Sequence, residues 1–267
     1  MGERQLALAS LSTGGAGPLD LVRLAAQAGF DQVGALRIVP TLAGAGASLV
    51  ADRRLLAATR RTLAECGLRV LDVEVFRLGP GGAAEAEPLL EVGAELGAQH
   101  LLTMVVDEEP GRRRETVHEL AALAAGYGVV PVVEFMVFSA VRTLADALAL
   151  VDGLPVDRVG VLVDALHLSR SGGHPRDLDG VPVGRLPYVQ LNDSLDAGPA
   201  DSPDDALVEA VSNRLAPGEG VLPLGDLLGR LAPEAPVSVE APLPAGWAVE
   251  EWAAHLARCT RDLVANV

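Results

Sequence analysis

Acidic side chains recur where apolar, strand-like runs of this sequence come to an end. Glu134 closes the run "VVPVVE", Asp164 closes "VGVLVD" and Glu240 closes "APVSVE". Burying a carboxylate is costly unless the charge is paired or bound to a metal ion. Each residue could therefore mark a strand that simply ends in water, or all three could belong to one site.

Alternation along a strand places residues two apart on the same face. One common register then puts Glu134, Asp164, Gln190 of "YVQLND" and Glu240 on a single face. In this register the opposite face carries four valines: Val133, Val163, Val189 and Val239. Three carboxylates brought that close would repel one another and raise each other's pKa. A divalent cation bound between them would compensate the negative charges. The pattern predicts a metal site with four ligands: Glu134, Asp164, Gln190 and Glu240. Oxygen ligands of this kind suit Mg²⁺ or Mn²⁺.

Other polar residues follow the same strand ends. His167 comes three residues after Asp164, and Glu74 and Arg77 end an earlier run, "LDVEVFRL". Arg214 stands in "NRLAPGEG", where it could clamp an anionic or polyhydroxylated substrate or form a salt bridge at the rim. We predict substrate contacts for these four residues. The polar loop 194–205 could be a mobile lid or a passive surface loop.

The elements that must position these groups alternate along the chain. Apolar strand-like runs are predicted at 6–12, 30–39, 68–78, 100–106, 129–138, 158–168, 186–193 and 235–242. Helical patterns follow most of them, for example at 49–66, 112–127, 222–231 and 247–264. Strands separated by helices indicate βαβ units and a parallel sheet. Eight such units predict an α/β fold, a parallel eight-stranded (β/α)8 TIM barrel forming one domain over residues 1–267.

Composition excludes several classes of function. The 267 residues are 49% hydrophobic, which is enough for a large core, and carry a net charge of -15. There is no basic stripe to track nucleic acid and no apolar run of membrane-spanning length. Neither nucleotide-binding fingerprint, GxGxxG or GxxxxGK[ST], occurs after a strand. We expect a cytoplasmic protein with a small-molecule substrate, without nucleic-acid or membrane partners, and a homo-dimer or homo-tetramer is compatible with the sequence.

Six motifs in order resemble the sugar phosphate isomerase/epimerase superfamily, the xylose-isomerase-like TIM barrels: "LDVEVFRL", "VVEF", "LVDALHL", "YVQLND", "NRLAPGEG" and "VSVEAP". The resemblance covers nearly the whole chain. It implies that Glu134, Asp164 and Glu240 bind a metal and that His167 contacts substrate. The family usually has a histidine ligand where this chain has Gln190, an uncharged and weaker donor. This departure favours Mg²⁺ or Mn²⁺ over Co²⁺ or Zn²⁺.

The resemblance also implies a reaction next to a carbonyl group. It implies a divalent-metal-dependent isomerase or epimerase of a sugar, sugar phosphate or related hydroxy-carbonyl compound. The reaction would pass through a metal-stabilised enediolate, with Glu134 and Glu240 as the two acid/base catalysts. Two alternatives stay open at this point. One is a dehydratase or lyase acting on a cyclitol, keto-sugar or specialised metabolite, and the other is a non-catalytic binding barrel with a weakened metal site.

Overall fold

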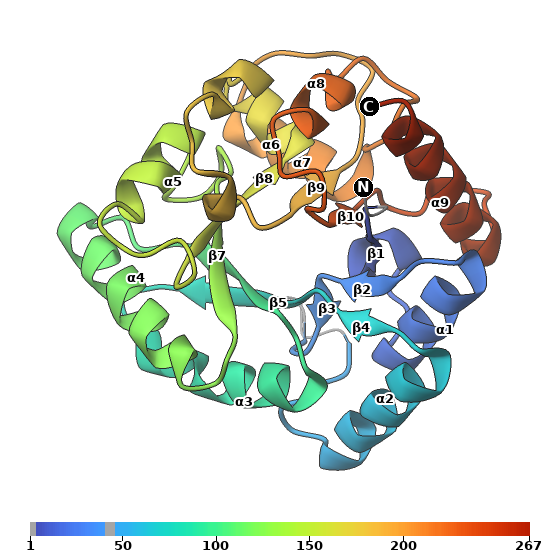
Figure 1. The fold of residues 1–267 in the computed structure, drawn as a ribbon, viewed down its shortest axis with the longest axis horizontal. Coiled ribbons are helices and arrows are strands. Elements are labelled where there is room, and N and C mark those ends of the chain that lie inside the picture. The colour runs from blue at the N-terminus through green and yellow to red at the C-terminus, as the bar shows by residue number, and fades with distance from the viewer. Residues whose placement is uncertain (1–3, 41–45) are drawn as a thin grey trace.

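A computed structural model describes residues 4–40 and 46–267, in which strands form a central ring and helices surround it (Figure 1). The strands are β1 (Leu6–Ala9), β2 (Gln32–Gly34), β3 (Leu36–Arg37), β4 (Arg69–Val70), β5 (Asp72–Leu78), β6 (His100–Val105), β7 (Val130–Glu134), β8 (Gly160–Asp164), β9 (Val189–Leu191) and β10 (Val237–Val239). The helices are α1 (Pro18–Ala28), α2 (Arg53–Cys66), α3 (Glu87–Leu96), α4 (Pro110–Ala125), α5 (Leu144–Leu150), α6 (Ala165–Arg170), α7 (Pro203–Ser212), α8 (Leu224–Leu228) and α9 (Val249–Ala265). Short 3-10 turns cover Ser10–Thr13, Ala83–Ala86, Pro175–Leu178 and Val183–Arg185.

The ten strands make an eight-stranded barrel because two barrel strands are interrupted. β2 and β3 are separated by Ala35, whose φ of 42° breaks the extended backbone, and β4 and β5 are separated by Leu71. The sheet order is β3-β5-β6-β7-β8-β9-β10-β1-β2-β4, and every strand pair is parallel. β2 pairs with β4 and β3 pairs with β5, so the two interrupted strands lie side by side and join the ends of the sheet. The predicted parallel (β/α)8 barrel is confirmed.

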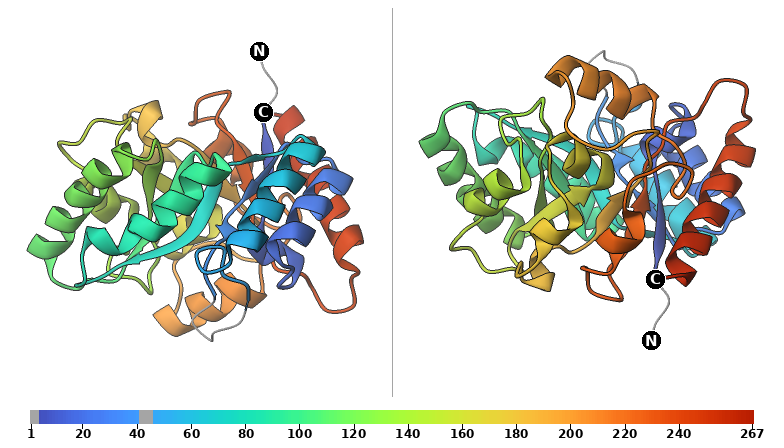
Figure 2. Two further views of the ribbon diagram at one scale, coloured as in Figure 1. Left: turned by 90° about the horizontal axis from the view of Figure 1, so that it is seen from below. Right: turned by 90° about the horizontal axis from the view of Figure 1, so that it is seen from above.

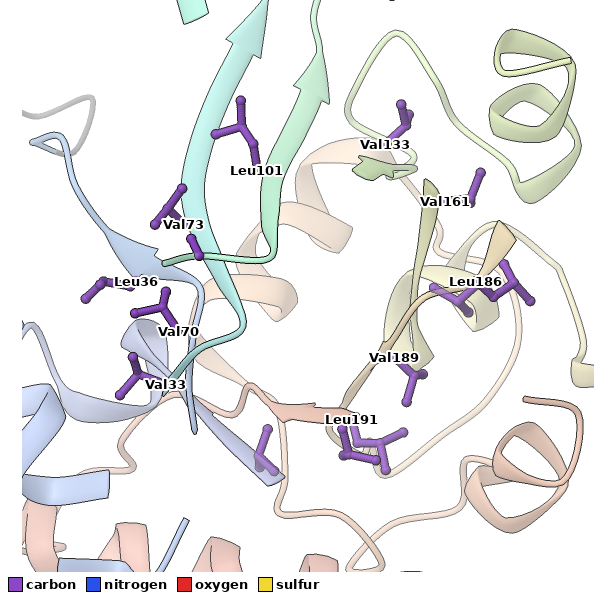
Figure 3. Close-up of a cluster of buried hydrophobic side chains, with 14 of the residues drawn as sticks. Val33, Leu36, Val70, Val73, Leu101, Val133, Val161, Leu186, Val189 and Leu191 are labelled. Atoms are coloured by element: carbon purple, nitrogen blue, oxygen red, sulfur yellow. The ribbon is translucent and has the colours of Figure 1, made fainter. Parts of the chain in front are cut away.

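Two layers of apolar side chains show that the strand register is the predicted one. The outer layer, between strands and helices, includes Val133, Val163, Val189 and Val239, and part of it is drawn in Figure 3. The inner layer fills the barrel with Ala7, Leu71, Leu102, Val132, Leu162 and Tyr188. Each fully buried aliphatic side chain contributes ~1.5–3 kcal/mol, so a one-residue slip of any strand would be strongly disfavoured. The register therefore fixes which side chains point into the barrel.

Several strands end before the predicted runs do, such as β7 at Glu134 rather than at residue 138, and two helices were not predicted. The run 158–168 was predicted as one strand, but β8 ends at Asp164 and the next residues form α6. The reason is a helix cap, because the carboxylate of Asp164 accepts a hydrogen bond from the backbone N–H of His167 at 3.0 Å. α7 was not predicted. It starts inside the polar stretch 194–205, where Ser202 caps it by accepting from Asp205 N at 3.1 Å.

α7 (orange) lies at the end of the barrel opposite the C-terminus, as both views of Figure 2 show. It follows β9, so it lies over the carboxyl ends of the strands, where barrel enzymes carry their active sites. Within the described parts of the chain, no helix is long and apolar enough to cross a membrane.

Candidate active site

Three carboxylates project from the carboxyl ends of β7, β8 and β10 into the barrel. Glu134 is the last residue of β7, Asp164 is the last residue of β8, and Glu240 directly follows β10. Their exposed fractions are 6%, 0% and 7%, so water screens none of them well. Buried acidic groups this close to one another favour neutral forms unless a cation compensates their charge.

Arg214 supplies part of that compensation. Its Nη1 donates to Asp164 Oδ2 and to Glu240 Oε2, both at 2.8 Å, and its Nε donates to the carbonyl of Ala210 at 2.6 Å. The residue reaches the site because an antiparallel bridge ties the adjacent Leu215 to Asp193, two residues after β9. Arg214 is itself only 6% exposed. A single buried guanidinium therefore bridges two of the three carboxylates.

Asp164 is held on all sides. Besides Arg214, its Oδ2 accepts from Asn192 Nδ2 at 2.7 Å, while its Oδ1 accepts from the backbone of His167. Burial acts against ionisation, but the charge of Arg214 and the other donors hold the pKa of Asp164 below its ordinary value. Asp164 is therefore ionised at neutral pH and fixed in direction.

Glu134 lies in a different environment, without a cationic hydrogen-bond partner within the described residues. Burial, reinforced by the charges of Glu240 and Asp164, raises its pKa well above the ordinary value. His167 lies close to it, with Nε2 3.8 Å from Glu134 Oε1. Burial lowers the pKa of His167 to about 4, so the imidazole is neutral at physiological pH. Its ring packs edge-on against Phe138, with centroids 5.5 Å apart.

These groups could hold a divalent cation. Glu134, Asp164 and His167 each offer a donor atom, and the three atoms lie within 4.8 Å of one another. Carboxylate oxygens and a neutral imidazole are ordinary ligands of divalent metals. Gln190 is completely buried in register with Asp164, and neither of its amide atoms has a hydrogen-bond partner among the described residues. An orphaned buried amide on the inner face is a further donor for a cation or a substrate, so the residues present fit such an ion.

A second polar group lies beside the first, on β3 and β5. Arg37 Nη2 donates to Glu74 Oε1 at 2.9 Å. Burial, together with the charge of Glu240, raises the pKa of Glu74 to about 8. Asp72, completely buried on the same strand, accepts from Ala35 N at 2.9 Å, and burial raises its pKa to about 7. Both groups can therefore exchange protons near neutral pH.

The structure brings together most of the residues singled out from sequence. Glu134, Asp164, His167, Arg214 and Glu240 form one contiguous cluster. Gln190 adjoins it in the sheet, and Glu74 interacts electrostatically with Glu240. Arg77 lies apart, exposed, with its Nη1 3.4 Å from Met104 Sδ.

Sequence reasoning missed two partners in the site. It did not assign Arg37, which pairs with Glu74, or Asp72, which lies below it on β5. Asp72 alternates with Glu74 along the strand, so the two-residue period could have indicated a second inward carboxylate. Arg37 could not be predicted in the same way. The backbone break at Ala35 interrupts the alternation of inward and outward side chains, so the face on which Arg37 lies does not follow from the residues before it.

Comparison with known proteins agrees with this architecture. Residues 22–263 match the family model described as xylose isomerase-like TIM barrel. The chain belongs to the xylose isomerase-like TIM barrel family. No curated protein matches the sequence significantly.

Solved structures share the fold of this family member at low sequence identity. A xylose isomerase-like TIM barrel/4-hydroxyphenylpyruvate dioxygenase fusion protein superposes with a TM-score of 0.81 at 20% identity, over 97% of this chain and 42% of that one. The chain thus spans less than half of that fusion protein. The IolI protein, described with a bound zinc atom, gives 0.77 at 20% identity over 98% of each chain.

Two further structures carry different reactions on the same fold. A D-allulose 3-epimerase from Methylomonas sp. gives a TM-score of 0.69 at 15% identity, over 98% of this chain and 99% of that one. A probable 3-DHS dehydratase, AsbF from Bacillus anthracis, gives 0.73 at 13% identity, over 96% and 98%. The fold family therefore includes epimerases and a dehydratase, and identities this low show the fold alone.

Proposed function

We propose that this protein is a divalent-metal-dependent isomerase or epimerase that moves a proton next to the carbonyl group of a small hydroxy-carbonyl compound, such as a sugar or sugar phosphate. The observation that carries the proposal is the unequal environment of the three buried carboxylates. Asp164 and Glu240 share the Arg214 guanidinium, whereas Glu134 has no cationic hydrogen-bond partner among the described residues. Burial raises the pKa of Glu134 well above its ordinary value and also raises that of Glu240, while Arg214 and the other donors hold the pKa of Asp164 down. Pairs of titratable groups in contrasting environments are typical of acid/base sites.

Each residue has a role that follows from its contacts. Glu134 is the proton acceptor, because a carboxylate whose pKa is raised towards the working pH is a better base than an ordinary one. Glu240 is the second acid/base: Arg214 holds Oε2, and we assign the proton transfer to its other oxygen, Oε1. His167, neutral and fixed by Phe138, hydrogen-bonds a substrate oxygen or binds the metal. Arg214 keeps the two paired carboxylates in place.

The cation belongs to this proposal as well. Glu134, Asp164 and His167 would hold it, with Gln190 as an additional oxygen donor. When bound, a divalent ion would polarise the substrate carbonyl and make the neighbouring C–H more acidic. A mixed set of carboxylates and one imidazole suits Mn²⁺, which accepts both ligand types, and is compatible with Zn²⁺ or Co²⁺.

Solvent deuterium exchange tests the proposal. The metal-loaded protein is incubated in D₂O with a panel of keto-sugars, aldoses and hydroxy-keto acids, and deuterium at carbon is followed by NMR. Incorporation should fall by about 100-fold or more in Glu134→Gln and Glu240→Gln. It should be unchanged in Glu115→Gln, an exposed glutamate on α4 that serves as the matched control.

Three results would reject this assignment. Full exchange in either glutamine variant would remove the two-base scheme. Loss of water from the substrate, seen as an ultraviolet-absorbing enone without exchange into recovered substrate, would make the protein a dehydratase instead. Binding of the metal and of a panel compound without any turnover would favour the non-catalytic barrel.

A further inference from the structure

A second cluster of metal-ligating side chains lies outside the barrel, on α9. His255 and Cys259 are one helical turn apart, so both side chains lie on the same face of the helix. Glu219, from the turn that follows Arg214, reaches the same point. One donor atom from each residue lies within 4.8 Å of the other two. None of these residues takes part in the site described above.

The separations between the donors fit a tetrahedral ion. His255 Nε2 lies 3.5 Å from Cys259 Sγ. An ion with Zn–N of ~2.05 Å and Zn–S of ~2.3 Å holds its nitrogen and sulfur ligands ~3.6 Å apart. Glu219 Oε1 lies 2.7 Å from the same nitrogen, which is hydrogen-bond distance. Its side chain is 44% exposed, so it can withdraw by the few tenths of an ångström that coordination requires.

The surroundings hold the imidazole in place. Trp247 and Trp252 lie against the ring of His255, with centroids 5.0 and 5.5 Å away. The side chain of His255 is only 16% exposed. A large cavity lined by Glu219 and both tryptophans borders the cluster, so a water molecule could reach the proposed ion from that side. Three protein ligands and one open position are a common zinc arrangement.

We propose that Glu219, His255 and Cys259 form a second site for a thiophilic divalent cation such as Zn²⁺ or Co²⁺. The ion would join α9 to the turn at 217–220, and so stabilise the segment that leads from Arg214 over the barrel rim. Binding releases the thiol proton of Cys259 and moves the imidazole proton of His255 to Nδ1. Arg258 Nη2 lies 3.1 Å from that Nδ1 in this structure, and because Arg258 is exposed, its side chain could move away when the ion binds.

The alternative is that the cluster binds no metal, and that His255 only hydrogen-bonds Glu219 and packs against the tryptophans. The two interpretations differ in the role of sulfur, because the hydrogen bond does not need Cys259. A sulfur-specific signal therefore separates them. It also separates this site from the barrel site, whose candidate ligands contain no sulfur.

The test is a Co²⁺ titration of the purified full-length chain under reducing conditions. A thiolate-to-cobalt charge-transfer band should appear in the near ultraviolet, saturate as cobalt is added, and disappear when Zn²⁺ is added. Cys259→Ser should abolish the band, and His255→Ala should weaken cobalt binding by about tenfold or more. Cys66→Ser is the matched control, since Cys66 is also a half-buried helical cysteine but belongs to no such cluster in the described residues.

Three outcomes would overturn the proposal. They are absence of the band in the unmodified protein, its persistence in Cys259→Ser, and its loss in Cys66→Ser. Glu134→Gln should keep the band, because that substitution affects only the barrel site. Zn²⁺ should also raise the thermal midpoint of Cys66→Ser by more than that of Cys259→Ser, in which only the barrel site can bind the ion, and this difference checks that the ion acts on the folded chain. Loss of the proposed enzymatic activity would leave all of these readouts unchanged.

Discussion

Replacing Arg214 by methionine is expected to destabilise the protein strongly at neutral pH. The guanidinium is almost completely buried and its Nη1 lies 2.8 Å from both Asp164 and Glu240. Removing one partner of a buried ion pair costs ~3–5 kcal/mol, because the remaining charge is left uncompensated. For a chain of this size the loss corresponds to a fall of about 5–9 °C in the thermal midpoint.

The pH dependence makes this prediction specific. In the unmodified protein the pKa of Asp164 is lower in the folded state than in the unfolded chain. The ionised Asp164 therefore stabilises the fold at pH values above the ordinary carboxyl pKa, and this stabilisation is lost as the pH falls through the lowered pKa of the folded state. Without Arg214 the buried carboxylates bind protons more readily when folded than when unfolded. The variant therefore gains stability as the pH falls from 7 to 5, and its deficit narrows.

Calorimetry at several pH values measures both effects. Arg53→Met is the control, because Arg53 pairs with Glu95 at 2.6 Å while 67% exposed, and such pairs contribute less than about 1 kcal/mol. Adding Glu240→Gln to Arg214→Met should restore part of the lost stability, since one unpaired charge is removed. A deficit for Arg214→Met no larger than that of Arg53→Met, or one that widens at acid pH, would refute the electrostatic role assigned to Arg214.

Two further predictions concern groups near the same site. Burial raises the pKa of Asp72 to about 7. Between about pH 4 and 7 the folded state therefore binds more protons than the unfolded chain, and the free energy of unfolding falls as the pH rises through that range. Asp72→Asn should remove up to ~1.4 kcal/mol per pH unit of this slope in denaturant titrations, and an unchanged slope would contradict the assignment. Gln190→His should strengthen Mn²⁺ binding by about tenfold in isothermal titration, because an imidazole replaces a weak amide donor, whereas Gln190→Leu should weaken it. Equal affinities in all three proteins would show that residue 190 does not contact the ion.

The fold and much of the site could be predicted because alternation in a barrel strand is a strong constraint. Val133 and Val163 face the helices, so Glu134 and Asp164 must face the barrel interior. The end of β8 was harder to predict. The apolar stretch after Asp164 forms α6, which begins where the Asp164 carboxylate accepts a hydrogen bond from the backbone N–H of His167. Apolar composition alone does not distinguish a short buried helix from a strand.

The pairing of Arg214 with Asp164 and Glu240 had no sequence signal of its own. The arginine stands 50 residues from Asp164 and 26 from Glu240, and its position depends on the bridge between Asp193 and Leu215. A sequence-based reading could name a rim salt bridge or a substrate clamp for it. Only the folded chain shows that it bridges two carboxylates that were predicted to bind metal.

Charge balance explains how that pairing can coexist with a divalent cation. Glu134, Asp164 and Glu240 together carry three negative charges when ionised, and Arg214 returns one positive charge. The two remaining negative charges are balanced by the two positive charges of one divalent ion. This balance holds because His167, with its lowered pKa of about 4, is neutral at physiological pH. In the metal-free protein the same imbalance, together with burial, raises the pKa of Glu134 well above its ordinary value. Cation binding would lower that pKa and favour release of the proton, so Glu134 would more readily accept a substrate proton when the metal that acidifies the substrate is also in place.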